Sequence, residues 1–161
     1  MKLFSKIILI VLLSTYGFAN DSYIRGLLSF YSIKNIDDSG LLFSTVIGEK
    51  LPSISPNLAM ELDLSYSADF SFDILEAGLY SAYTLHIPHS SFALTPRVGI
   101  NYEKLNIAEL AFEERDDKIE GFFLSYGLGI FYQMDKERSY YVDLTEKGNN
   151  QVLGYGIQFA F

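Results

Sequence analysis

The chain has 161 residues, a length typical of one domain, and carries 12 basic against 20 acidic residues for a formal net charge of −8. This acidic balance argues against a nucleic-acid partner, because binding to phosphates needs a basic surface. The sequence contains no cysteine, which excludes disulfides, thiolate zinc sites and an acylated lipoprotein amino terminus.

Residues 1–19 are predicted to be a secretory signal peptide that is cleaved after export. Lys2 and Lys6 give a positive start, residues 7–13 are apolar, and Gly17-Phe18-Ala19 matches a small-x-small cleavage site. The alternative is a membrane anchor, but the apolar run is much shorter than the about 20 residues that a spanning helix needs. Cleavage leaves residues 20–161 as one expected domain with 10 basic and 20 acidic residues, a net charge of −10.

The rest of the chain reads as strand-like runs separated by turn-rich segments. No later stretch supplies an apolar helix that could cross a membrane, although hydrophobic residues make up 49% of the chain. All runs except the short seventh are near or above the about 9 to 11 residues that a tilted strand needs to cross a bilayer. The eight runs are residues 22–33, 40–50, 57–67, 71–86, 91–103, 119–134, 139–146 and 151–161.

Alternation with a period of two is clearest in the run 119–134. One face carries large apolar residues such as Phe122 and Leu124, and the other is mostly small; the runs 57–67 and 91–103 divide in the same way. A soluble barrel would expose many Lys, Glu and Thr side chains, whereas small side chains suit the crowded interior of a narrow barrel whose apolar face meets lipid. The pattern predicts an all-β fold, an eight-stranded antiparallel up-and-down transmembrane β-barrel, with a soluble periplasmic barrel as the alternative.

The connections between the runs alternate between two expected sides. Outer-membrane barrels use tight periplasmic turns and longer outer loops, with both termini in the periplasm when the strand number is even. The predicted turns are residues 49–56, 86–90 and 135–138, and the predicted outer loops are residues 34–39, 67–70, 104–118 and 147–150.

The chain ends on an aromatic residue, with apolar residues at every second position before it: Tyr155, Ile157, Phe159 and Phe161. This ending resembles the terminal signal strand of outer-membrane barrels, and the resemblance implies recognition by the barrel-assembly machinery. Residues 22–161 resemble the small eight-stranded outer-membrane β-barrel family of the OmpA-transmembrane-domain and OmpX type. The segments that carry this resemblance are residues 23–33, "SPNLAMELDLSY", "FALTPRVGINYEKL", "GFFLSYGLGIFYQM" and "GYGIQFAF".

The resemblance implies a location in the cell outer membrane, in contact with lipid and lipopolysaccharide. Members of this family serve in adhesion, as small pores or in mechanical anchoring. We expect a monomer with a structural or surface-interaction role, no catalysis, no cofactor and no metal, whose surface ligand the sequence does not name. The alternatives are a narrow pore for ions or small solutes and a lipid A-modifying enzyme.

Charged residues on the small face form the most informative polar set. The alternation points seven of them into the lumen, where an unpaired charge would cost several kcal/mol, so they are expected to pair. We call this set the lumen charge network: Arg25, Glu61, Asp63, Glu76, Arg97, Glu103 and Asp143. One interpretation is a structural plug of salt bridges; the other is a gated conduit, whose currents would vanish on Arg97→Ala or Glu76→Ala.

Two histidines beside two serines, in the segment His86-Ile87-Pro88-His89-Ser90-Ser91, suggest a base with a nucleophile or a pair of metal ligands. A turn built on Pro88 is the competing interpretation, because Pro and Ser are ordinary turn residues. The segment is also expected on the inner side, away from the outer leaflet.

The longest predicted loop, residues 104–118, combines an apolar stripe with charges. Its apolar residues could extend a hairpin or form a short helix. Its carboxylates could recruit divalent cations that bridge lipopolysaccharide, or form a merely solvated tip. The charged residues are Glu113, Glu114, Arg115, Asp116 and Asp117.

Several of the 12 tyrosines lie near strand ends, where aromatic rings form interfacial girdles. The expected girdle residues are Tyr23, Tyr31, Tyr66, Tyr102, Tyr132 and Tyr140.

Overall fold

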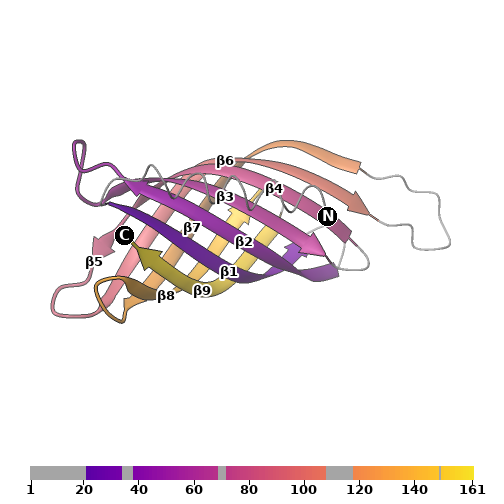
Figure 1. Ribbon diagram of the computed structural model, residues 1–161. Coiled ribbons are helices and arrows are strands. Elements are labelled where there is room, and N and C mark those ends of the chain that lie inside the picture. Colours follow the sequence, from indigo (N-terminus) through magenta and orange to yellow (C-terminus); the bar gives the residue numbers. More distant parts are fainter. Residues whose placement is uncertain (1–20, 34–37, 69–71, 108–117, 149) are drawn as a thin grey trace.

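The computed structural model describes residues 21–33, 38–68, 72–107, 118–148 and 150–161, and these residues form one closed barrel (Figure 1). Eight long strands and one two-residue strand make up its wall. They are β1 (Ser22–Ile33), β2 (Asp38–Lys50), β3 (Leu58–Ala68), β4 (Phe72–Tyr83), β5 (Leu85–His86), β6 (Phe92–Ile107), β7 (Lys118–Gln133), β8 (Arg138–Lys147) and β9 (Asn150–Ala160). No helix that could cross a membrane occurs in this part of the chain.

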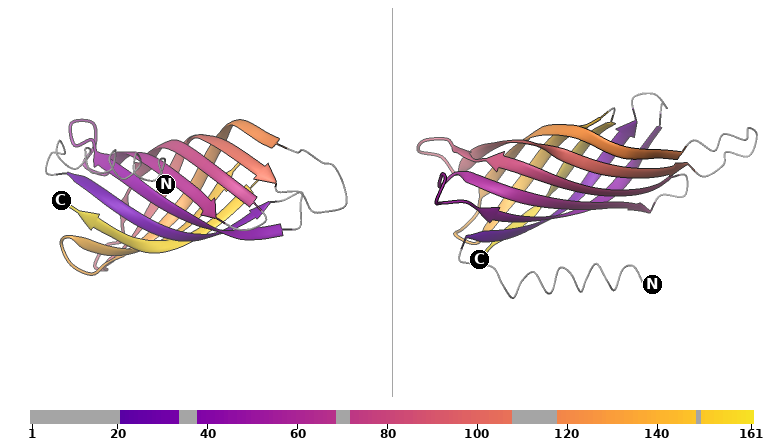
Figure 2. Two further views of the ribbon diagram at one scale, coloured as in Figure 1. Left: turned by 45° about the vertical axis from the view of Figure 1, so that its right-hand side comes forward. Right: turned by 90° about the horizontal axis from the view of Figure 1, so that it is seen from above.

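The strands follow an up-and-down order, in which every long strand pairs antiparallel with its neighbours in sequence. β4 also pairs with β6, and β1 pairs with β9, with Tyr23 opposite Ala160 and Ile33 opposite Asn150. These pairings close the sheet on itself, and the strands run obliquely around the axis (Figure 2). The prediction of an eight-stranded antiparallel up-and-down barrel is confirmed.

The predicted run 71–86 is not one strand, because it breaks at Thr84. In the register of β4 with β6, Ala82 faces Arg97, which would place Tyr83 opposite Pro96. Proline has no N–H to donate to the ladder, so the pairing is interrupted there. The Thr84 N–H donates to the carbonyl of Asn57 at 2.8 Å, and the short β5 then resumes the pairing with β6.

The two ends of the barrel differ. Residues 51–57, 87–91 and 134–137 connect strands at one end, where the carboxyl end Phe161 also lies; we call this the turn end (Figure 1). β1, β3, β6 and β8 finish at the opposite end, the loop end. The strands extend into all four predicted outer loops: β2 starts at Asp38, β3 ends at Ala68, β6 continues to Ile107, and Lys147 and Asn150 are the paired last and first residues of β8 and β9.

Large apolar side chains point outward and polar ones inward. On β7, Phe122 is 77% exposed and Leu124 is 66% exposed, whereas Glu61 on the inner face of β3 is fully buried. The predicted division of faces therefore holds. The girdle prediction is wrong for Tyr23 and Tyr31, which are buried in the lumen because they share the inward parity of Arg25.

Glycines on the inner wall make room for the large side chains of the lumen. Gly48 lies opposite Tyr23 across β1 and β2, and a Cβ atom at Gly48 would overlap the Tyr23 ring. A Cβ atom at Gly129 would likewise overlap the phenol group of Tyr141. The small inward residues in the sequence are thus the space into which buried tyrosines pack.

Candidate functional site

The structure places all seven residues of the lumen charge network inside the barrel, each at most 4% exposed. The strands β1, β3, β4, β6 and β8 supply them, and the alternation of each strand turns them inward. Most of the network is joined by direct ion pairs, and Glu103 is the exception.

Arg97 on β6 is the centre of the network. Its Nη2 lies 2.8 Å from Asp143 Oδ2 on β8 and 3.4 Å from Asp63 Oδ2 on β3, and its Nη1 lies 3.4 Å from Glu61 Oε2. Thr145 Oγ1 accepts from both Nε and Nη2 of Arg97. One planar guanidinium thus links three strands of the wall, a geometry that an ammonium group does not offer.

Arg25 on β1 occupies the turn-end side of the network. Its Nη2 lies 3.0 Å from Glu61 Oε1, and its guanidinium carbon lies 3.5 Å from the centre of the Tyr141 ring, a cation–π contact. Gln158 Oε1 accepts from Nε and Nη2 of Arg25, and the Tyr23 hydroxyl donates to Glu61 at 2.6 Å. Both carboxylate oxygens of Glu61 are therefore occupied by donors.

Lys147 belongs to the same network, although the sequence analysis placed it in a loop. Its ammonium group is buried, 2.5 Å from Glu76 Oε2 and 3.7 Å from Asp63 Oδ2. The signal was present in the sequence, because Lys147 keeps the inward parity of Asp143 and Thr145. The residues that follow Lys147, Gly148 to Asn150, are typical of turns and therefore predict a loop at this position instead.

Glu103 accepts hydrogen bonds from neutral groups. The Tyr31 hydroxyl donates to it at 2.7 Å and the side-chain amide of Asn150 donates to both of its oxygens. Tyr31 and Glu103 lie on β1 and β6, opposite strands of the eight-stranded wall, so this contact crosses the whole lumen. With Lys147 included, the buried set described here holds three basic and five acidic residues.

The segment from His86 to Ser91 is a tight turn. Ser90 N–H donates to the carbonyl of Ile87, Pro88 follows Ile87, and His89 has a φ of 58°, as the third position of a type II turn requires. The Ser90 hydroxyl also donates to the Ile87 carbonyl and accepts from the N–H of Phe92. The N–H and the hydroxyl of Ser90 therefore both form hydrogen bonds within the turn.

Asp135 organises the last turn, between β7 and β8. Its Oδ1 accepts from the N–H groups of Glu137 and Arg138, and its Oδ2 lies 2.6 Å from Nη2 of Arg138. The hydrogen bonds from the Arg138 side chain and these N–H groups hold the pKa of the Asp135 carboxyl below its usual range.

The other predicted sites fall outside the lumen. Tyr155, Ile157 and Phe159 lie on the outer face of β9 and Phe161 directly follows this strand; the four side chains are between 39% and 59% exposed. Residues 108–117, which include the acidic residues Glu113, Glu114, Asp116 and Asp117 as well as Arg115, lie outside the described part of the chain. Within the described ranges, no group of three or more His, Asp or Glu residues has a metal-binding arrangement.

Comparison of the sequence with protein families and with curated proteins finds no match. Solved structures, in contrast, share the fold. The N-terminal β-barrel domain of Pseudomonas aeruginosa OprF has a TM-score of 0.71 at 14% identity, over 88% of this chain and 98% of that chain. Neisserial surface protein A scores 0.57 at 12% identity, over 87% and 96%. Ail of Yersinia pestis scores 0.53 at 11% identity, over 86% and 97%.

Proposed function

We propose that this chain, whose fold is that of the small eight-stranded barrels found in bacterial outer membranes, spans the outer membrane as a structural protein. The observation that carries the proposal is the distribution of its side chains. Charged groups are buried around the barrel axis, while Phe122, Leu124 and Ile100 are more than half exposed on the outer wall. In water such a surface would favour association, whereas in a bilayer it meets hydrocarbon.

The proposed role is membrane integrity, with surface contacts through the connection between β6 and β7. That connection contains the charged run from Glu113 to Asp117. Ail is described as an outer membrane protein and NspA as a surface protein, and both share this fold. The proposed partners are lipid, lipopolysaccharide and the barrel-assembly machinery, the last through the terminal strand that ends on Phe161.

A plug is the proposed state of the lumen, and a catalytic role is not proposed. Arg97 links Asp143 to Asp63, and the pair of Lys147 with Glu76 joins the non-adjacent strands β8 and β4. These contacts cross the path that an ion would take. Silence of the purified barrel in planar bilayers would support the plug, and steady currents that vanish on Arg97→Ala would support a narrow pore instead.

Cysteine labelling on intact cells tests the location and the orientation together. Because the natural chain has no cysteine, a single substitution gives one labelling site. Ser53→Cys lies in the exposed turn 51–57, and Lys104→Cys lies at the loop end of β6. A membrane-impermeant maleimide is expected to label Lys104→Cys on intact cells and Ser53→Cys only after lysis. Recovery of the protein in membrane-free periplasmic extract would overturn the proposal.

A further inference from the structure

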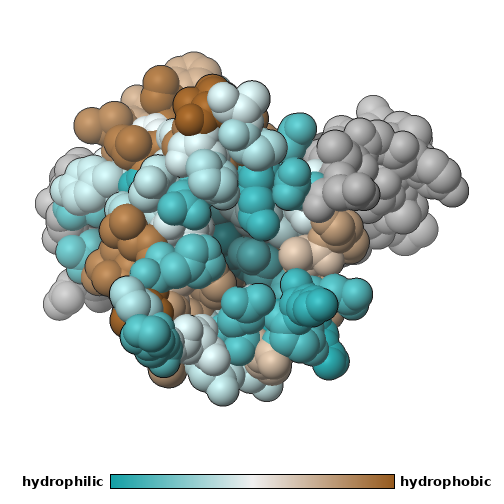
Figure 3. All heavy atoms as spheres, turned by 90° about the vertical axis from the view of Figure 1, so that its left-hand side faces the viewer, coloured by the Kyte–Doolittle hydropathy of each residue, from teal (hydrophilic) through white to brown (hydrophobic). Residues whose placement is uncertain are grey.

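A cavity of about 130 Å³ opens at the turn end of the barrel. Figure 3 looks onto this end and shows a central hollow ringed by hydrophilic side chains. The cavity has room for several water-sized groups, each of which needs about 10 to 15 Å³. We call this cavity the vestibule. It lies above the lumen charge network and opens along the barrel axis.

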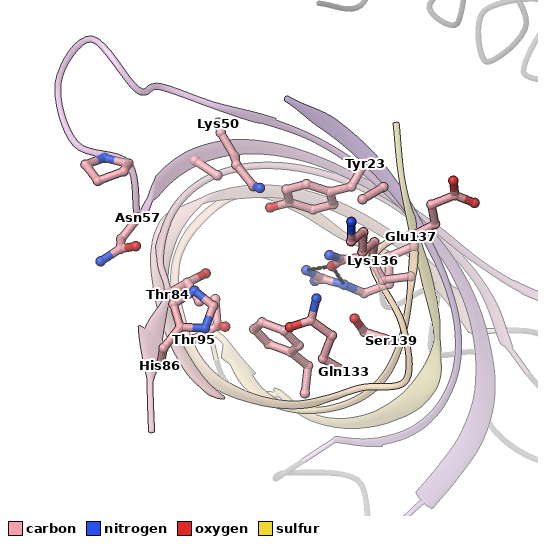
Figure 4. A pocket seen from close by; sticks show the side chains of 16 residues that line it. Tyr23, Lys50, Asn57, Thr84, His86, Thr95, Gln133, Lys136, Glu137 and Ser139 are labelled. Carbon is pink, nitrogen blue, oxygen red and sulfur yellow. Dashed lines mark hydrogen bonds between the residues drawn. The ribbon is translucent and has the colours of Figure 1, made fainter. Parts of the chain in front are cut away.

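Most of the charged side chains that line this vestibule are basic. Arg25, Lys50 and Lys136 line it, against one acidic residue, Glu137. In Figure 4 the Lys50 side chain points into the opening, and Glu137 points away from it. The exposed rim of the vestibule therefore carries two ammonium groups, those of Lys50 and Lys136, against the single carboxylate of Glu137.

The carboxylates nearest to Arg25 and Lys136 are already engaged by other donors. Glu61, below Arg25, has one oxygen bonded to Tyr23 and Arg25 and the other paired with Arg97. Asp135, next to Lys136, is held by Arg138 and by the N–H groups of its own turn. The ammonium groups of Lys50 and Lys136 are thus left to act on whatever enters the mouth.

The floor of the vestibule holds polar atoms without partners. Arg25 is 1% exposed and Thr95 is 3% exposed, and both line the cavity. Nη1 of Arg25 and Oγ1 of Thr95 have no hydrogen-bond partner among the described residues. Buried polar atoms of this kind usually have a partner in a folded protein, and a water molecule, an ion or a ligand in the vestibule would supply one.

We propose that the turn-end vestibule binds a small soluble oxyanion, a carboxylate or a phosphate, between Lys50 and Lys136 above Arg25. Both chemistries offer oxygens to ammonium and guanidinium donors. The vestibule opens along the axis and is walled from the outer surface by the strands, so it takes its ligand from the aqueous phase. This inference does not depend on the membrane location or on the plug.

Titration of the refolded full chain in zwitterionic detergent tests the proposal. Inorganic phosphate and succinate are added in separate experiments at constant ionic strength, and the amide resonances of Lys50, Thr95 and Lys136 are followed by NMR. Saturable shifts at these residues are expected with at least one of the two anions. Their relative affinities distinguish the phosphate class from the carboxylate class.

Three matched variants make the test specific. Lys50→Gln and Lys136→Gln are each expected to weaken binding about tenfold, the effect of losing one charged hydrogen-bond donor. Lys104→Gln removes an exposed charge at the loop end of β6, far from the vestibule lining, and is expected to leave the affinity unchanged. All three residues are exposed, so each variant is expected to fold. Absence of saturable shifts, or equal weakening by Lys104→Gln, would overturn the proposal.

Discussion

The ammonium nitrogen of Lys147 lies 2.5 Å from Oε2 of Glu76, and both side chains are 1% exposed. Lys147 is the last residue of β8, and Glu76 lies on β4, a strand that does not pair with β8. The ion pair therefore fixes the distance between two separate parts of the wall. Its energy depends on both partners, because either charge alone would be buried without compensation.

Lys147→Met is expected to lower the free energy of unfolding by about 3 to 5 kcal/mol, because it leaves Glu76 and Asp63 without this cation. Urea unfolding of the protein in lipid vesicles, followed by circular dichroism, measures the change. The exposed Lys104→Met is the control and should change stability by no more than about 0.5 kcal/mol. Equal effects of the two substitutions would show that the buried ion pair does not contribute more to the free energy of unfolding than an exposed lysine does.

Arg97→Gln is expected to destabilise the barrel by a similar amount, about 3 to 5 kcal/mol, since three carboxylates then lose a shared partner. Arg97→Lys should cost less, because it keeps the charge but loses the fork that reaches Asp143 and Thr145 together. The same unfolding measurement ranks the two variants. A result in which Lys is no better than Gln would mean that geometry, not charge, dominates at this position.

The sequence predicts which charged side chains point into the lumen, but not which of them form ion pairs with one another. The parity of each strand correctly turned Arg97 and Asp143 inward, because side chains alternate with a period of two. Parity does not say which inward residues meet across the lumen, since that depends on the stagger between strands that do not pair. Arg97 contacts Asp63 from β3 and Asp143 from β8, strands on either side of it in the wall.

At three positions the strand parity predicts the direction of a side chain better than the residue type does. The preference of tyrosine for interfaces predicts a girdle position for Tyr23 and Tyr31, yet both share the parity of Arg25 and are buried. The predicted loop 147–150 includes Lys147, yet Lys147 shares the parity of Asp143 and is buried. In a narrow barrel the position of a residue along its strand, and not its residue type, decides whether the side chain points inward or outward.

Gly129→Ala tests the packing of the lumen. The added methyl group would overlap Tyr141, so a loss of about 1 to 3 kcal/mol in the free energy of unfolding is expected. Gly26→Ala is the matched control, because a Cβ atom there meets nothing within 4 Å. The double variant Gly129→Ala with Tyr141→Phe should recover part of the loss, since the phenolic oxygen is among the atoms that clash. If the double variant is as unstable as Gly129→Ala alone, the loss of stability does not come from the overlap with the phenolic oxygen.

His89→Gly is expected to stabilise the turn after β5 by up to about 1 kcal/mol, because glycine adopts a positive φ without the strain of a side chain. His89 has a φ of 58°. His89→Ala removes the imidazole but keeps the strain, and should show no gain. Thermal unfolding, read as the shift between folded and unfolded bands on a gel, compares the three proteins. A gain with Ala equal to that with Gly would implicate the imidazole instead.

Ile100→Arg tests whether the outer wall faces lipid. Ile100 is 58% exposed near the middle of β6, and a charge there is expected to cost about 2 to 4 kcal/mol in a bilayer. Phe92→Arg lies on the same face at the turn end of β6 and should cost about 0 to 1 kcal/mol. Unfolding in lipid vesicles measures both. Equal, small costs would mean that the outer wall is hydrated.

The pairing of β1 with β9 joins the first strand of the described chain to the last. Each of the other long-strand pairings joins strands that follow one another along the chain, whereas this seam joins segments separated by nearly the whole domain. The cylinder can therefore seal only after synthesis of the final strand. Until then both margins of the sheet offer unsatisfied amide and carbonyl groups to any other strand. A chain that stops short of β9 would have no means of hiding them, and we expect it to aggregate or to be degraded.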